Sequence, residues 1–212
     1  MKKAFLTQEI GSIQRPIWRQ KLGAPANPGW IADALQWGEK LGVGERGELA
    51  NNQGTGLLQK DGAARSEAEK ARIVEIAGIY VIRMFEAAGL DRVYNGEQPR
   101  TEMYDTFSSR TENISTAGFV NSFDSNYFRK GILEGRVSVK ADALQWFRGE
   151  YEFTAKNTAR VVKPCVTGPY TMLDWSFPEY YLGKHGASGI ATRAISAAAR
   201  REAVLDFAEN VL

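Results

Sequence analysis

A glycine, a proline and a tryptophan lie close together in the segment VKPCVTGPYTMLDWSF, residues 162–177. Residues 161–166 predict a short buried strand, and Gly168-Pro169 ends it with a turn. A helix then starts, with Trp175 one turn into it. An exposed backbone, a rigid proline and an indole ring form a platform on which a flat heterocycle can stack. A tryptophan at this spacing can equally belong to the hydrophobic core, so the segment alone leaves both interpretations open.

The order of these residues resembles the T-G-P-x-T-M-L-x-W-S-F motif of cobalamin-independent methionine synthase. Two further motifs of the same catalytic barrel occur upstream in the same order. EIGSI at residues 9–13 is similar to the family's first-strand Ile-Gly-Ser motif, and GEQPRTEM at residues 96–103 is similar to its Gly-Glu-x-x-Arg-x-acidic-Met motif. The resemblance runs from about Phe5 to the last residue and covers the front part of that family's catalytic barrel, within the uroporphyrinogen decarboxylase-like superfamily.

The resemblance implies an amino-acid site. In the family, the substrate homocysteine carries an ammonium, which needs a carboxylate, and a carboxylate, which needs backbone donors. By this resemblance Ile10, Gly11 and Ser12 hold the amino-acid end of homocysteine through backbone groups, and Glu97 receives the ammonium. The alternatives are a turn or cap role for Ser12 and a solvated turn acid for Glu97. No catalytic residue is assigned.

The resemblance also implies a methyl-donor site, in which Trp175 stacks on the pterin ring of methyltetrahydrofolate. Here the sequence departs from the family. Asn126 and Tyr127 stand where the family has an Arg-Cys pair in the region that contacts the folate tail. The donor therefore stays open between methyltetrahydrofolate and a methylcorrinoid, as in shorter single-barrel relatives.

Zinc is the cofactor that the resemblance implies for the complete family enzyme, where it holds homocysteine as a thiolate. The family's ligands are a His-x-Cys pair, a Glu and a later Cys, all beyond the part that resembles this chain. Cys165 falls in a predicted buried strand, which favours an inert thiol. His185 sits in a glycine-rich turn. We therefore expect no metal ligands in this chain and no zinc bound by it alone.

The bulk composition is that of a globular protein, and 212 residues suffice for one domain with a core. The formal net charge of +2 gives no reason to expect nucleic acid or an anionic membrane as a partner. No apolar run has the length of a signal peptide or a membrane span. The single cysteine excludes an internal disulfide and fits a cytoplasmic location.

Alternating strands and helices position these motifs. The patterns predict strands at residues 4–10, 91–96 and 161–166, helices at 28–41, 141–157 and 188–212, and a possible hairpin arm at 119–123 and 132–139. Ser66 and Glu69 predict a capping box for a helix that runs to Ala88 and ends at Gly89. The glycine-rich stretch 42–62 predicts a long surface loop.

This alternation predicts an α/β fold. Together with the resemblance it predicts a partial (β/α)8 TIM-type barrel, with residues 1–212 as a single incomplete catalytic-barrel domain. A complete barrel needs about 250 residues. We therefore expect a partner, either a second copy of the chain or a complementary C-terminal half. The functions left open are methyl transfer to homocysteine, a non-catalytic or split-enzyme subunit that keeps an amino-acid pocket, and a related barrel acting on a corrinoid or porphyrin-like substrate.

Overall fold

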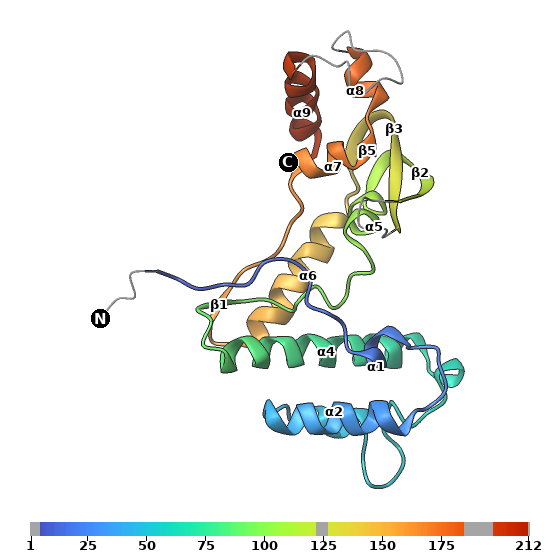
Figure 1. The fold of residues 1–212 in the computed structure, drawn as a ribbon, viewed down its shortest axis with the longest axis vertical. Helices are drawn as coiled ribbons and strands as arrows, with labels where there is room; N and C mark the ends of the chain where they lie inside the picture. Colours follow the sequence, from blue (N-terminus) through green and yellow to red (C-terminus); the bar gives the residue numbers. More distant parts are fainter. Residues whose placement is uncertain (1–4, 122–126, 185–196, 212) are drawn as a thin grey trace. The chain divides into compact units, whose positions relative to one another are not determined.

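The computed structural model describes residues 5–121, 127–184 and 197–211, which fall into two compact units (Figure 1). Unit 1 comprises Met1–Pro99 and Arg148–Cys165, and unit 2 comprises Arg100–Phe147 and Val166–Leu212. Both units combine helices with strands, so the fold is α/β, as predicted.

The helices of unit 1 are α1 Ile17–Gln20, α2 Pro28–Lys40, α3 Arg46–Leu49, the 3-10 turn η1 Gly62–Ala64 and α4 Glu67–Ala87. Side-chain caps start α2, η1 and α4, whereas the single-turn helices α1 and α3 have none. At the start of α2, the Asn27 side chain accepts hydrogen bonds from the first-turn amides. At the start of α4, Ser66 and Glu69 form the predicted capping box, and Gly89 follows the helix with φ of +76°.

The main core of unit 1 lies between α2 and α4, which run alongside each other in Figure 1. Trp18 meets the ring of Tyr80 edge-on at 5.4 Å between centroids, and the Tyr80 hydroxyl donates to the carbonyl of Ala34. Leu49 and Leu58, from the stretch predicted to be a surface loop, are also buried there. Residues 50–61 form neither helix nor strand, as the loop prediction expected. The prediction was wrong for residues 46–49, which form α3, and in its surface position, because Leu49 and Leu58 bury their side chains against the core.

A parallel pair of short strands lies at the second hydrophobic cluster of unit 1, which contains Val81, Ile82, Phe85, Val93 and Tyr94. Strand β1 Arg92–Val93 pairs with β4 Val161–Val162, as neighbouring strands of a barrel do. Both strands are shorter than predicted. The predicted strand at residues 4–10 is absent from its described part, residues 5–10. The Thr7 carbonyl accepts the backbone amides of Asp91 and Arg92, and the Thr7 amide donates to the Asp91 carboxylate. Gln8 is joined to Arg92 only through side chains, so no ladder forms.

Unit 2 is built around an antiparallel hairpin of β2 Thr111–Asn121 and β3 Tyr127–Val139, which confirms the predicted arm. Strand β5 Ser176–Phe177 adds to β3 in parallel. The helices α5 Met103–Ser108, α7 Pro169–Asp174, α8 Glu179–Lys184 and α9 Ala197–Val211 complete the unit. Helix α6 Ala143–Lys156 contributes residues to both units. The core of unit 2 is centred on Tyr104, Leu133, Met172, Tyr181 and Phe207.

Candidate functional site

Ser12 and Glu97 meet in unit 1, although 85 positions separate them in the chain. The Ser12 hydroxyl donates a hydrogen bond to Oε2 of Glu97. Ser12 is exposed and Glu97 is half-buried, so the carboxylate is fixed by the fold and still reachable from solvent. The structure thus brings together the two side chains that the sequence singled out in two separate motifs.

An unusual turn delivers the Glu97 carboxylate to this position. Gly96 has φ of +66° and Glu97 has φ of +57°, so two successive residues are left-handed. For a residue with a Cβ this conformation costs about 1–2 kcal/mol. A Cβ on Gly96 would lie 2.7 Å from a methyl group of Val81, so glycine is required there. The Asn95 side chain accepts a hydrogen bond of 3.0 Å from the Glu97 amide and so supports the turn.

Several contacts fix the segment that carries Ile10, Gly11 and Ser12. The Tyr94 hydroxyl donates to the Gly11 carbonyl, and the backbone amide of Ile13 donates to the carbonyl of Gly96 at 3.2 Å. Lys163, which follows β4, donates from Nζ to the carbonyl of Glu9 at 2.8 Å. The side chain of Ile10 is exposed. The segment is therefore tied to the residues that follow both strands of the parallel pair.

The downstream side of Glu97 is anchored by two buried groups. Gln98 donates from Nε2 to the Ile13 carbonyl at 3.2 Å, and Arg19 donates from Nε to the Gln98 carbonyl at 3.0 Å. Burial, and then the charge of Arg15, lower the pKa of the Arg19 guanidinium from its usual value. The partly desolvated guanidinium of Arg19 therefore holds the backbone next to Glu97.

Sequence reasoning missed Tyr94, Asn95, Gln98 and Lys163. A usable signal was present for one of them, because Asn95-Gly96 is a dipeptide typical of turns. No comparable local signal marks the other three, because their roles depend on which segments the fold brings together.

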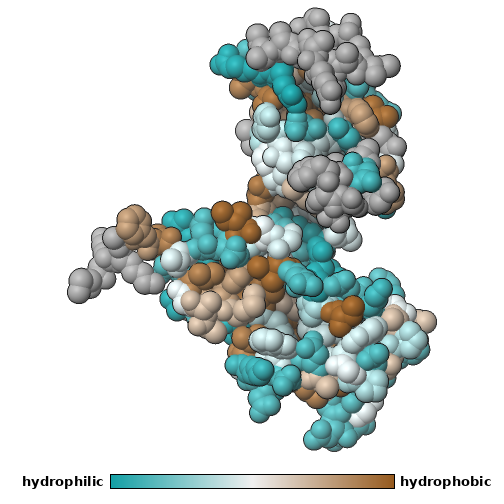
Figure 2. All heavy atoms as spheres, in the orientation of Figure 1, coloured by the Kyte–Doolittle hydropathy of each residue, from teal (hydrophilic) through white to brown (hydrophobic). Residues whose placement is uncertain are grey.

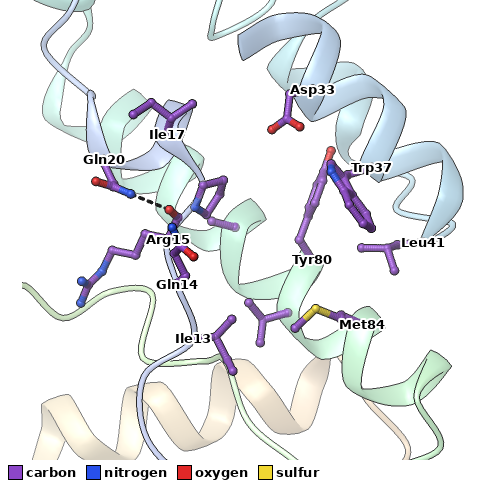
Figure 3. A pocket seen from close by; sticks show the side chains of 13 residues that line it. Ile13, Gln14, Arg15, Ile17, Gln20, Asp33, Trp37, Leu41, Tyr80 and Met84 are labelled. Atoms are coloured by element: carbon purple, nitrogen blue, oxygen red, sulfur yellow. Dashed lines mark hydrogen bonds between the residues drawn. The ribbon is translucent and has the colours of Figure 1, made fainter. Parts of the chain in front are cut away.

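A cleft of unit 1 begins directly after the Ser12 position (Figure 3). It has a volume of about 440 Å³ and lies between the segment 13–20 and the helices α2 and α4. Figure 3 shows Trp37 and Tyr80 side by side in it, with Asp33 above them and Met84 below. Its lining is mostly apolar, so it suits an apolar group.

The predicted donor-site residues belong to unit 2. Trp175 is the C-cap residue of α7, a position later in the helix than predicted, because the helix is short. It is half-buried and packs against the core cluster around Met172 and Leu173. Tyr127 begins β3, while its side chain and all of Asn126 lie outside the described residues. That Trp175 shares one face with Ser12 and Glu97 stays a prediction.

The described residues contain no group of three or more His, Cys, Asp and Glu side chains that could hold a metal ion. Cys165 is half-buried beside the cluster of Val93 and Tyr94, and it follows β4 where the sequence predicted that it lies within a strand. His185 lies outside the described part of the chain. No helix in that part is long and apolar enough to cross a membrane.

Comparison with known proteins shows that most of the chain matches one protein family. Residues 53–209 match the family model described as "Cobalamin-independent synthase, Catalytic domain". A methionine synthase from Thermoplasma volcanium is 39% identical over 114 residues, which are 53% of this chain and 32% of the relative. One from Pyrococcus horikoshii is 35% identical over 119 residues, 56% of this chain and 34% of the relative. A 5-methyltetrahydropteroyltriglutamate–homocysteine methyltransferase from Synechococcus sp. is 37% identical over 117 residues, 54% of this chain and 15% of the relative.

A solved structure is similar as well. It is a B12-independent methionine synthase from Shewanella sp. W3-18-1 in complex with selenomethionine. The TM-score is 0.52 at 19% identity, and the match covers 94% of this chain and 44% of that one. This likeness confirms the predicted methionine-synthase-like α/β fold. The aligned part of the chain spans about a third of the length of the archaeal relatives named above.

Proposed function

The chain belongs to the catalytic-domain family of the cobalamin-independent synthases, and from this premise we propose that it supplies the homocysteine-binding part of a methyltransferase that forms methionine. The observation that carries the proposal is the hydrogen bond from Ser12 to Glu97, which unites two motifs in one accessible place. The relatives named methionine synthase support the same reaction class.

The amino-acid end of homocysteine has two charges, and the chain offers a group for each. The carboxylate of Glu97 receives the ammonium in a charge-assisted hydrogen bond. The backbone of Ile10, Gly11 and Ser12 binds the substrate carboxylate. For this the Ile10 amide exchanges its hydrogen bond to the Glu9 side chain, 2.9 Å long in the structure, for one to the substrate. Because the Tyr94 hydroxyl already occupies the Gly11 carbonyl, the amides of this segment are held in a fixed orientation before the substrate arrives.

Methyltetrahydrofolate is the methyl donor that we favour, with the Trp175 ring stacked on its pterin. The name of the Synechococcus relative supports a pteroylglutamate donor. Asn126 and Tyr127 are proposed to lie near the donor's tail. A methylcorrinoid is the alternative donor, because these two residues replace the Arg-Cys pair of the family motif.

Zinc would hold the homocysteine sulfur as a thiolate in a complete enzyme of this family. The described residues of this chain do not fit that role, since no suitable ligand group is present among them and Cys165 packs against apolar side chains. We therefore propose that this chain alone does not bind the zinc, and that its own part in the reaction is to bind and orient homocysteine.

The test of the binding role is a calorimetric titration with homocysteine and with methionine. The variant Glu97→Gln is expected to lose about 1.5–3 kcal/mol of binding free energy, because the carboxylate no longer meets the ammonium. Glu39→Gln, which removes an exposed acid from α2, is the matched control and is expected to bind like the wild type. Equal affinity of the wild type and Glu97→Gln would remove Glu97 from the site.

A partner is proposed because unit 1 exposes large apolar side chains, among them Phe5, Ile10 and Val161. Figure 2 shows hydrophobic side chains gathered on the visible face of this unit. A second copy or a complementary C-terminal half would cover such a surface, and the proposed compartment is the cytoplasm. Mixing the chain with that half should give methionine formation that neither part shows alone. Zinc bound stoichiometrically by this chain would contradict the split.

If the mixture stays inactive with both methyl donors while homocysteine still binds, the second candidate function applies. That candidate is a non-catalytic subunit with an amino-acid pocket. The absence of a metal-ligand group among the described residues, combined with an intact Ser12–Glu97 pair, is the observation that favours it.

A further inference from the structure

We propose that Asn95 is a positioning residue that sets the Glu97 carboxylate in its binding orientation, an inference that rests on the proposed homocysteine site. Asn95 is the residue before the left-handed pair Gly96 and Glu97. In the described part of the chain, no hydrogen bond joins its side chain to the Ser12 hydroxyl or to the Glu97 carboxylate. Its effect on the substrate is therefore exerted through the backbone of Glu97.

The first argument is the hydrogen bond itself. Oδ1 of Asn95 accepts from the amide of Glu97 at 3.0 Å, two residues further along, which is the geometry of an Asx turn. Glutamate rarely adopts a left-handed backbone, because its Cβ approaches the following carbonyl. Only Glu97 and Asn113 do so among the non-glycine residues that the structure describes. An outside contact is needed to keep Glu97 in this conformation, and Asn95 provides one.

The second argument is the cost of burying Asn95. Its side chain is only 4% exposed, and its Nδ2 donor has no hydrogen-bond partner in the described part of the chain. A buried amide nitrogen without a partner opposes folding. Among the described residues, the Asn95 side chain makes a single hydrogen bond, which it accepts from the Glu97 amide. A buried polar group kept for one contact is typical of a constrained functional site.

The third argument is that the other bonds of the turn hold different groups. The amide of Gln98 donates to the Asn95 carbonyl at 3.3 Å and closes the turn around Gly96 and Glu97. Gly96 contributes its carbonyl to the amide of Ile13, and the Gln98 side chain donates to the Ile13 carbonyl. None of these bonds engages the Glu97 amide, which is the group that the Asn95 side chain binds. The direction of the peptide that carries this amide decides where the carboxylate points.

The test uses the full chain and two variants of Asn95. Asn95→Ala removes the acceptor, and Asn95→Asp keeps an oxygen at the same distance along the side chain. The first readout is amide hydrogen exchange at Glu97, which needs no ligand. We expect exchange about tenfold faster in Asn95→Ala, and within about threefold of the wild type in Asn95→Asp, with the amides in the middle of α4 as the internal reference.

Thr154→Val is the matched control, because it removes a buried polar group of unit 1 whose hydrogen bond, to the Glu150 carbonyl at 2.9 Å, lies within α6 and outside the turn. It is expected to leave exchange at Glu97 unchanged relative to the α4 reference. Unchanged exchange in Asn95→Ala, or equally accelerated exchange in Thr154→Val, would overturn the positioning role.

The second readout is affinity for homocysteine. Asn95→Ala is expected to bind about tenfold more weakly than the wild type, and Asn95→Asp is expected to restore most of that loss. Full affinity in Asn95→Ala would overturn the inference. If neither the wild type nor Glu97→Gln binds homocysteine, the proposed function fails, and the exchange measurement still decides whether Asn95 holds the turn.

Discussion

The side chain of the buried Tyr94 holds a segment that is distant in the sequence. It donates to the Gly11 carbonyl, which belongs to the segment carrying Ser12. Tyr94→Phe keeps the ring and removes this bond. We expect the free energy of unfolding, measured by urea denaturation, to fall by about 1 kcal/mol. Tyr151→Phe, at an exposed position of α6, should leave it unchanged. Equal stabilities for both variants would show that the Gly11 contact contributes nothing.

How far the site residues could be predicted from the sequence depends on whether a local motif marks them. Ser12 and Glu97 could be predicted, because each stands in a motif, and the structure places them in contact. The left-handed conformation of Glu97 could not, because glutamate has no preference for it and only its surroundings hold it there. The motif allows Trp175 to be either a platform or a core residue, and a half-buried ring that packs on Met172 and Leu173 is compatible with both.

Where α2 packs against α4, helix propensity and steric space have opposite effects on a substitution at Gly38. Alanine is a better helix former than glycine by about 1 kcal/mol, so Gly38→Ala in α2 should be stabilising on propensity alone. A Cβ at Gly38 would, however, lie 2.4 Å from the Tyr80 hydroxyl and 2.7 Å from the Cβ of Arg46. We expect the clash to dominate and unfolding to become easier by about 1–3 kcal/mol.

Gly149 in α6 is the matched control for Gly38. Nothing lies within 4 Å of a Cβ built there, so Gly149→Ala should raise the free energy of unfolding by about 0.5–1 kcal/mol. Thermal or urea unfolding of both variants gives the comparison. Stabilisation by Gly38→Ala would mean that the two helices are packed less closely than described.

The short helix α3 is joined to α4 by a two-point ion pair. Arg72 contacts both carboxylate oxygens of Glu48, at 2.7 and 2.8 Å. The hydrogen bond from Arg72 holds the pKa of Glu48 below its usual value. Since the folded-state pKa is depressed, the pair stabilises the protein above the unfolded-state pKa of about 4.3. That stabilisation is lost as the pH falls through the lower, folded-state pKa.

We therefore expect Glu48→Gln to reduce the free energy of unfolding by at most about 1 kcal/mol at pH 7, because the pair is partly exposed. The difference from the wild type should shrink as the pH falls from 5 to about 3. Glu39→Gln controls for the loss of one negative charge. A difference that persists unchanged at pH 3 would show that the variant acts through packing and not through the charge of Glu48.

Helices and strands differed in how well the sequence predicted them. Helix α4 was predicted nearly to the residue, because the capping box of Ser66 and Glu69 and the stop at Gly89 are local signals. The strands β1 and β4 were predicted at the right places and too long, because apolar runs do not show where pairing with a neighbour ends. Helix α3 was missed, because it is a single turn formed where Leu49 and Leu58 are drawn into the core.

The organisation of the whole chain poses the question of whether residues 1–212 form one domain, as the sequence predicted. The described residues pack around separate clusters in the two units. The chain nevertheless passes between the units after Pro99, after Phe147 and after Cys165. Unit 1 is therefore closed only when the intervening residues 100–147 bring its two segments together, which costs loop-closure entropy.

Folding of unit 2 lowers that entropy cost, since its hairpin orders much of the same intervening segment. Helix α6 adds a covalent link, because one continuous helix contributes residues to both units. We therefore expect a single cooperative transition in calorimetry. Ile76→Ala in unit 1 and Leu133→Ala in unit 2 remove fully buried side chains, and each should destabilise the protein by about 2–5 kcal/mol. In a single domain both variants shift the same transition, and the calorimetric and van't Hoff enthalpies stay equal. Two transitions, each moved by only one of the variants, would show that the chain consists of two domains and that the single-domain prediction is wrong.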